Sequence, residues 1–326
     1  MSKKLVSLFL ALLMMLSMTT VVVAEDTSVT ITDMHGREIV LTEPVTRIVA
    51  LTPADCEILC AIGCEDMLVG RGKYCDYPET ILELPALATG DNLNVEEILA
   101  LEPQIVLMSD MNQTDEQVQL LEQNGVKVVV SETTDIEGVY TAIRMISTLV
   151  GKEAEGEAVI AKMQATFEYI SGLCEKTDKT IYFEVMPLEW GLWTAGDKTF
   201  MHELAHICGM ENAFADIVDW QAISAEQVIE RDPDYIVLVT GMGETAVDEV
   251  LGREGWGDMK AIKAAAVYNA DSYAMTRPGP RLMEAAIGLY EFLYGVEIDE
   301  TAIPDAPAAP AQTEVPAATE VPAETK

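Results

Sequence analysis

Two segments of the chain repeat one pattern about 130 residues apart, and this repeat restricts the possible folds more than any other feature. The first begins at Asn94 and reads NVEEILALEPQIVL, and the second begins at Ser224 and reads SAEQVIERDPDYIVL. Each opens on a favourable helix N-cap, has Glu97 or Gln227 three positions later, and ends with an acidic residue and proline before an apolar strand. The repeat predicts two similar lobes, each with a helix that begins in a capping box.

Between these segments the sequence favours one long helix. Apolar residues recur at helical spacing from Lys152 to Glu175, and no strand pattern interrupts residues 136–176. On both sides short apolar strands alternate with amphipathic helices, which is typical of an α/β protein. We therefore predict two similar α/β lobes, over residues 25–150 and 178–300, joined by one rigid helix over 151–177. The expected strands lie at 28–32, 38–41, 47–51, 104–108, 126–130, 180–185, 235–239 and 266–269, and the shorter helices at 53–62, 114–124, 200–208 and 281–294.

The two ends of the chain do not have the composition of a folded core. Lys3 and Lys4 precede an uncharged apolar run with a cleavage site after Ala24, so residues 1–24 are predicted to be a secretory signal peptide. An uncut signal that holds the chain in the membrane is the alternative. Because no cysteine precedes Cys56, we expect an exported periplasmic or extracellular protein without a lipid anchor. Residues 301–326 are rich in Pro, Ala and Glu and predict a flexible tail.

The charge of the chain excludes some partners. The 20 basic residues face 55 acidic ones, for a net charge of -35, and loss of Lys3 and Lys4 with the signal leaves 18 against 55, or -37. Such a surface repels nucleic acids and anionic lipid.

Six cysteines invite a disulfide or metal interpretation. Cys56, Cys60 and Cys64 are spaced four apart in one predicted helix, so that their side chains stack instead of facing each other. No standard zinc spacing matches them, although a metal site remains the alternative. We predict small buried thiols.

Short motifs in a fixed order carry a resemblance to a known family. They include PVTRIVAL at 44–51, PADCEIL at 53–59, YCDYP at 74–78, WTAG at 193–196, GMENAF at 209–214 and RPGPR at 277–281. From about Asp33 to Tyr294 the chain resembles the iron-siderophore, cobalamin and haem class of periplasmic binding proteins. The resemblance implies two lobes with a cleft between them, a bound metal chelate (a corrinoid, haem or a ferric siderophore), no intrinsic cofactor, and delivery by a monomer to a membrane permease dimer with its ATPase.

Aromatic residues are the first candidates for contact with such a ligand, because they cover broad flat faces well. The resemblance implies that Tyr74, Trp193 and Trp220 line the cleft, and Tyr77 lies in the same loop region as Tyr74. Ordinary core packing is the alternative for each.

Two arginines are further ligand candidates. Arg277 and Arg281 are unusual in so acidic a chain, and a guanidinium can hold an anionic chelate with two hydrogen bonds. For Arg281 an equally simple interpretation is a helix-start residue bonded to a neighbouring acid.

The repeated segments pair two carboxylates, Glu96 and Glu226, in the first turns of their helices. Their position is favourable against the helix dipole. Two equivalent carboxylates also suit a symmetric basic partner, and the resemblance implies that they meet arginines of the permease.

An enzymatic alternative comes from His202-Glu203-Leu204-Ala205-His206. Histidines four apart on a helix can bind zinc, with Glu203 as general base of a metallopeptidase. The longer motif would place a third histidine where the chain has Asn212, so that Glu226 or Glu230 would have to complete the site. Because the segment continues into the binding-protein pattern at Gly209, we predict no enzyme and no resident metal. Contact of His202 or His206 with a ligand's metal is a further alternative.

Overall fold

The computed structural model describes residues 28–304, apart from residues 113, 242 and 244. The predicted signal peptide and residues 305–326 of the predicted tail lie outside this part. Within it, a short 3-10 helix, η6 (Glu300–Ala302), occupies the start of the predicted tail. No helix in the described ranges is long and apolar enough to span a bilayer.

The N-terminal lobe is built on a parallel five-stranded sheet with the strand order β5, β4, β3, β6, β7. Its strands are β3 (Ile48–Ala50), β4 (Leu68–Gly72), β5 (Ala86–Leu87), β6 (Ile105–Met108) and β7 (Lys127–Val130). Helices α2 (Pro53–Ala61) and α5 (Ile136–Leu149) pack on one face, and α3 (Val95–Ala100) and α4 (Asp115–Gln123) on the other. Because both faces are covered, β3 and β6 are apolar and buried along their length.

The C-terminal lobe repeats this layering around a parallel four-stranded sheet with the order β10, β8, β12, β13. Its strands are β8 (Thr180–Glu184), β10 (Glu211–Asn212), β12 (Tyr235–Leu238) and β13 (Val267–Asn269). One face carries α7 (Phe200–Ile207), α11 (Ser272–Thr276) and α12 (Leu282–Tyr294), and the other carries α8 (Ala225–Arg231), α9 (Ala246–Leu251) and α10 (Lys260–Lys263). A small antiparallel pair, β9 (Trp193–Ala195) and β11 (Trp220–Ala222), is added to this lobe.

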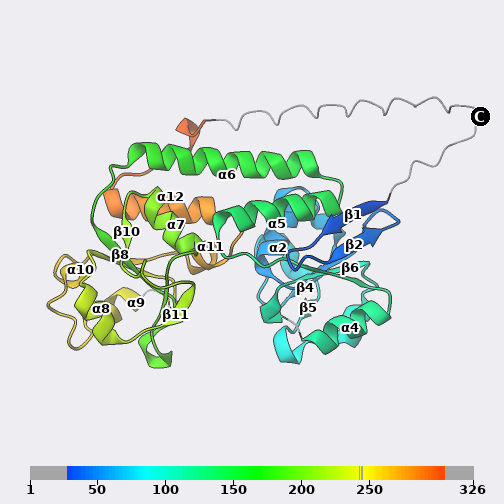
Figure 1. The fold of residues 1–326 in the computed structure, drawn as a ribbon, viewed down its shortest axis with the longest axis horizontal. Coiled ribbons are helices and arrows are strands. Elements are labelled where there is room, and N and C mark those ends of the chain that lie inside the picture. The colour runs from blue at the N-terminus through cyan, green and yellow to red at the C-terminus, as the bar shows by residue number, and fades with distance from the viewer. Residues whose placement is uncertain (1–27, 113, 242, 244, 305–326) are drawn as a thin grey trace, which may run out of the picture.

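Helix α6 (Glu153–Leu173) runs along both lobes and packs against α5, α7 and α12 (Figure 1). Its buried residues Met163, Phe167 and Ile170 belong to one apolar cluster that also contains the inner sheet faces of both lobes. Gly156 allows a close approach to α5, because a Cβ there would lie 2.4 Å from Ser147 Oγ. Within residues 28–304 the lobes therefore share a core beneath α6, and the chain passes from the first lobe to the second through this helix.

Most of the predicted elements are present. The opening hairpin forms as β1 (Val29–Thr32) and β2 (Glu38–Leu41), and the predicted long helix is α6. Strands β4, β5, β9, β10 and β11 and helices α5, α9, α10 and α11 were not predicted. The capping box is present at Ser224, but the predicted box at Asn94 is wrong, because Glu97 accepts a hydrogen bond from the Asn94 side chain at 3.1 Å.

Candidate functional site

Aromatic side chains follow the carboxyl ends of parallel strands in both lobes. Tyr74 and Tyr77 lie in the segment 73–78 after β4, which we call the aromatic loop, and their side chains are exposed. Trp193 follows β8 and is 38% exposed. In α/β sheets ligands bind outside the carboxyl ends of the strands, where the strand order reverses. Here that reversal lies between β3 and β6 and between β8 and β12.

The structure pairs the two predicted tryptophans on β9 and β11. Trp193 lies opposite Ala222, and Trp220 lies opposite Ala195, so that the two tryptophans are diagonal neighbours on one face of the ribbon. The Trp220 ring packs on Phe200 with 5.5 Å between ring centroids. Trp220 is therefore mainly a packing residue, and its predicted contact with a ligand stays a prediction.

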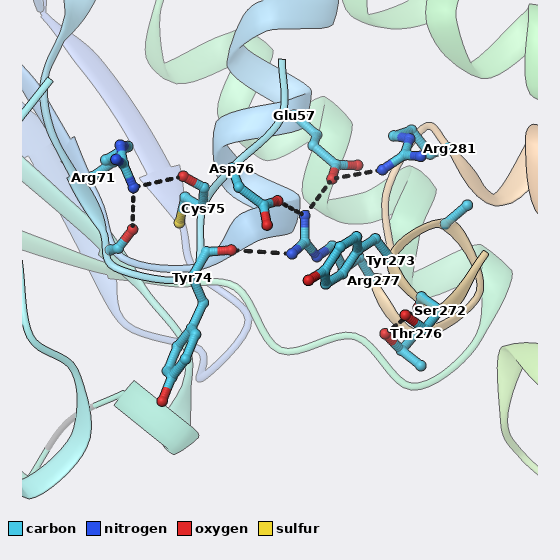
Figure 2. A network of polar contacts seen from close by, with 12 residues as sticks. Glu57, Arg71, Tyr74, Cys75, Asp76, Ser272, Tyr273, Thr276, Arg277 and Arg281 are labelled. Atoms are coloured by element: carbon cyan, nitrogen blue, oxygen red, sulfur yellow. Dashed lines mark hydrogen bonds and ion pairs between the residues drawn. The ribbon is translucent and has the colours of Figure 1, made fainter. Parts of the chain in front are cut away.

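The guanidinium of Arg277 crosses from the C-terminal lobe to the N-terminal lobe (Figure 2). Its Nη1 donates to Asp76 Oδ1 at 2.6 Å and to Glu57 Oε1 at 3.5 Å, and its Nη2 donates to the carbonyl of Tyr74 at 3.1 Å. The Arg277 side chain is only 9% exposed. Nη1 and Nη2 thus each have partners within the protein, and ligand binding through this guanidinium stays a prediction.

Arg281 lies at the start of a helix and is bonded to neighbouring acids, which was the alternative to ligand binding. It is the N-cap of α12, and its guanidinium donates to Glu284 at 3.0 Å and to Asp271 at 2.9 Å. The guanidinium also lies 4.2 Å from the ring centroid of Tyr77, which joins the two lobes a second time. Its predicted contact with a ligand remains untested.

Glu57 lies between the two arginines on helix α2, where Asp55 is the other charged residue. The side chain of Glu57 is 2% exposed, and Oε2 has no hydrogen-bond partner. Burial raises the pKa of this carboxyl from 4.5 to about 7, although Arg281 and Arg277 act in the opposite direction. The charge of Glu57 is thus expected to change near neutral pH.

Sequence reasoning missed three members of this region: Glu57, Asp76 and Tyr273. Tyr273 is 53% exposed, and its ring centroid lies 4.2 Å from the Arg277 guanidinium. Two signals were available, since Tyr273 lies four positions after a predicted strand, and Glu57 and Asp55 interrupt the apolar pattern of a predicted helix. Neither signal shows that the residues meet, because Asp76 and Arg277 are 201 positions apart.

The predicted thiols are free, and four of the six are fully buried: Cys56, Cys64, Cys75 and Cys208. Burial raises the pKa of the Cys60 thiol to about 12, so it is a poor metal ligand at neutral pH. No group of three His, Cys, Asp or Glu side chains within the described ranges is arranged to hold a metal ion.

The structure does not support the metallopeptidase alternative. Glu203, the required general base, accepts a hydrogen bond at 2.7 Å from the backbone N–H of Ile136, the first residue of α5. Asn212, at the position of a third histidine, is buried and donates to the carbonyl of Ala195. The imidazole Nε2 of His202 lies 3.6 Å from Asp197 Oδ1, and that of His206 lies 3.5 Å from Glu211 Oε2. Contact of either histidine with a ligand's metal stays a prediction.

Glu96 and Glu226 are both exposed in the first turns of α3 and α8. Helix α3 packs against α4, and Figure 1 places α4 and α8 on the side of the lobes remote from α6. Glu96 also lines a recess of about 560 Å³, formed by residues of α3 and α4 and separate from the aromatic residues. The two carboxylates thus occupy equivalent positions, one on each lobe.

Comparisons with known proteins agree with this architecture. Residues 48–274 match the family model described as periplasmic binding protein. The uncharacterized ABC transporter substrate-binding lipoprotein YvrC of Bacillus subtilis (strain 168) is 30% identical over 274 residues, which cover 82% of the chain and 85% of the relative. The vitamin B12-binding protein of Vibrio parahaemolyticus is 27% identical, with 78% and 92% covered. The heme-binding protein RhuT of Roseiflexus is similar in structure, with a TM-score of 0.69, 25% identity, and 76% and 98% covered.

Proposed function

The chain belongs to the periplasmic binding protein family, and from this premise we propose that it is the subunit of an ABC importer that captures a corrinoid. As a member of this family it is a binding protein and not an enzyme. The solved structures that share its fold include proteins named for haem and for vitamin B12, so the fold alone does not select the ligand.

The observation that carries the proposal is the set of exposed aromatic rings that follow the carboxyl ends of the strands in both lobes. Tyr74 and Tyr77 come from the N-terminal lobe, and Tyr273 and Trp193 come from the C-terminal lobe. The backbone of Tyr74 and the ring of Tyr273 both contact Arg277, so these two residues lie close together across the junction. Aromatic rings from two sides suit a broad, flat macrocycle.

The charges around these rings favour a corrinoid over the other chelates. Haem and many ferric siderophores are anionic, and their recognition favours unoccupied cationic donors. Here Arg277 and Arg281 are already bonded to acidic residues. The Nζ of Lys73 lies 4.6 Å from the Tyr74 ring centroid. The amide groups around a corrin ring need no such donor. The similarity to vitamin B12-binding proteins supports the same ligand class.

Titration of the tryptophan fluorescence with cobalamin, cobinamide, hemin and two ferric siderophores tests the ligand. We expect saturable quenching by the corrinoids and a weaker response to the anionic chelates. Saturable binding of hemin alone would assign the site to haem, and no response to any probe would refute capture of these chelates.

A tryptophan pair tests the position of the ligand. Trp193→Ala removes a ring from the predicted contact surface and should weaken cobinamide binding about tenfold, or ~1.4 kcal/mol. Trp190→Ala is the matched control, because this ring is 70% exposed and lies three positions away. Equal cobinamide affinities for both variants and the unchanged protein would show that β9 is not part of the ligand site.

We further propose that Glu96 and Glu226 dock the protein on its permease. Their equivalent positions on the two lobes suit a two-fold partner, and a monomer that presents one carboxylate per lobe is sufficient. Replacement of both residues by Ala should leave cobinamide affinity unchanged and reduce binding to the permease in nanodiscs. Lower cobinamide affinity would instead place these residues at the ligand.

The location of the protein is part of the proposal. Extracytoplasmic placement agrees with the family. Cleavage after Ala24 and the absence of a lipid anchor stay predictions. The relative YvrC, which is 30% identical, is named a lipoprotein. Mass spectrometry of the protein secreted by its natural host would detect both the cleavage and any acyl chain.

A further inference from the structure

One ion pair connects the two lobes at the aromatic loop. Arg277, which directly follows α11, reaches Asp76 with a 2.6 Å hydrogen bond, and the partners are 201 positions apart. The guanidinium is nearly buried and Asp76 is partly exposed, so the pair is screened less than a surface ion pair. The same group also contacts Glu57 and the Tyr74 carbonyl.

The aromatic loop is held from two sides (Figure 2). On the side of the N-terminal lobe, Arg71 donates to the carbonyls of Cys75 at 2.9 Å, Ile81 at 3.1 Å and Leu82 at 3.2 Å. On the side of the C-terminal lobe, Arg277 donates to the carbonyl of Tyr74. The backbone is therefore fixed between two arginines, while the Tyr74 ring points away from both.

Arg277 also supports the facing aromatic residue. Its guanidinium lies 4.2 Å from the Tyr273 ring centroid, a distance typical of a cation–π contact. One planar group thus sets the positions of an aromatic residue in each lobe. A lysine could not replace it, because an ammonium lacks the flat fork that bonds Asp76 and the Tyr74 carbonyl together.

We propose that Arg277 and Asp76 form an inter-lobe tie that positions the aromatic loop opposite Tyr273, and that they set ligand affinity without contacting the ligand. This assignment rests on the proposed ligand site. It gives Arg277 a role different from the anion-binding one that its residue type alone predicts.

The experiment is a double-mutant cycle on cobinamide binding with Asp76→Asn, Arg277→Lys and the double variant. In a tie, either change breaks the same contact. Each single variant should bind about tenfold more weakly, and the double variant should bind no more weakly than the weaker single variant. If Arg277 instead contacts the ligand independently of Asp76, the two losses will multiply, and the tie is refuted.

A second measurement does not need a ligand. Hydrogen exchange of peptides covering residues 71–82 should be faster in each ligand-free variant than in the unchanged protein, because the loop has lost one of its two supports. Unchanged exchange would overturn the positioning role even where affinity falls. If the unchanged protein binds none of the probes, the proposed function fails, while the exchange measurement still decides whether the tie holds the loop. Asp76→Asn alone keeps this test available if Arg277→Lys does not fold.

The C-terminal lobe offers a matched control. Arg231 bonds Asp216 through two hydrogen bonds of 2.6 and 2.8 Å, and its guanidinium lies 4.2 Å from the Phe214 ring centroid. This arrangement has the same chemistry as the tie but joins no second lobe. Asp216→Asn and Arg231→Lys should change neither cobinamide affinity nor exchange of the aromatic loop. A loss of affinity equal to that of the tie variants would show that the effect is not specific to the lobe junction.

Discussion

The buried carboxyl of Glu57 makes a specific prediction about stability and pH. Its pKa is raised from 4.5 to about 7 in the folded protein, mainly by burial. Between these two values the folded state holds a proton that the unfolded state releases, so the free energy of unfolding falls as the pH rises. Because one pKa unit corresponds to ~1.4 kcal/mol, Glu57 should remove about 3 kcal/mol of stability between pH 4.5 and pH 8.

Glu57→Gln tests this value, since glutamine has a similar shape and does not titrate. Near pH 4.5, where Glu57 is protonated, the two proteins should have similar stability. By pH 8 the variant should be more stable by about 3 kcal/mol. Loss of the negative charge should not leave either arginine without an acidic partner. Arg277 still pairs with Asp76, and Arg281 still pairs with Asp271 and Glu284.

Urea unfolding followed by circular dichroism at several pH values between 4.5 and 8 measures the difference. The buried Asp55, whose pKa burial raises to about 6, contributes equally to both proteins and cancels. Glu226→Gln is a control in which the effect of pH on stability should have the opposite sign. The pKa of Glu226 is lowered by its own backbone N–H and by Ser224, so this charge stabilises the folded protein as the pH rises. Parallel stability curves for Glu57→Gln and the unchanged protein would refute the reasoning.

Three further predictions concern the scaffold. Gly72→Ala should lower the free energy of unfolding by about 2–3 kcal/mol, because its Cβ would lie 2.2 Å from the Leu51 carbonyl oxygen. Gly172→Ala on α6 is the control, because its Cβ would meet nothing within 4 Å and should not destabilise the protein. Equal urea midpoints for the two variants would contradict this prediction. Glu203→Ala should cost about 1 kcal/mol by removing the acceptor for the N–H of Ile136, and an unchanged urea midpoint would exclude this capping role. Because both lobes share one core, X-ray scattering should detect no large contraction when cobinamide binds.

The sequence alone determined the features that depend on neighbours within a few residues. Helical and alternating apolar periods placed α6, α12 and the central strands, because these periods reflect which face of each element is buried. The capping box at Ser224 was likewise encoded by residues three apart. Short elements such as β5, which has two residues, carry too little pattern to be found this way.

The partners of polar side chains were decided only by the tertiary structure. Residue type gave Arg277 the chemistry of an anion receptor and gave Glu203 that of a general base. The fold brings Asp76 to Arg277 and the start of α5 to Glu203, across 201 and 67 positions, and thereby gives both side chains structural partners. Local pattern contains no information about such distant pairs, since chain folding alone brings them within hydrogen-bonding distance.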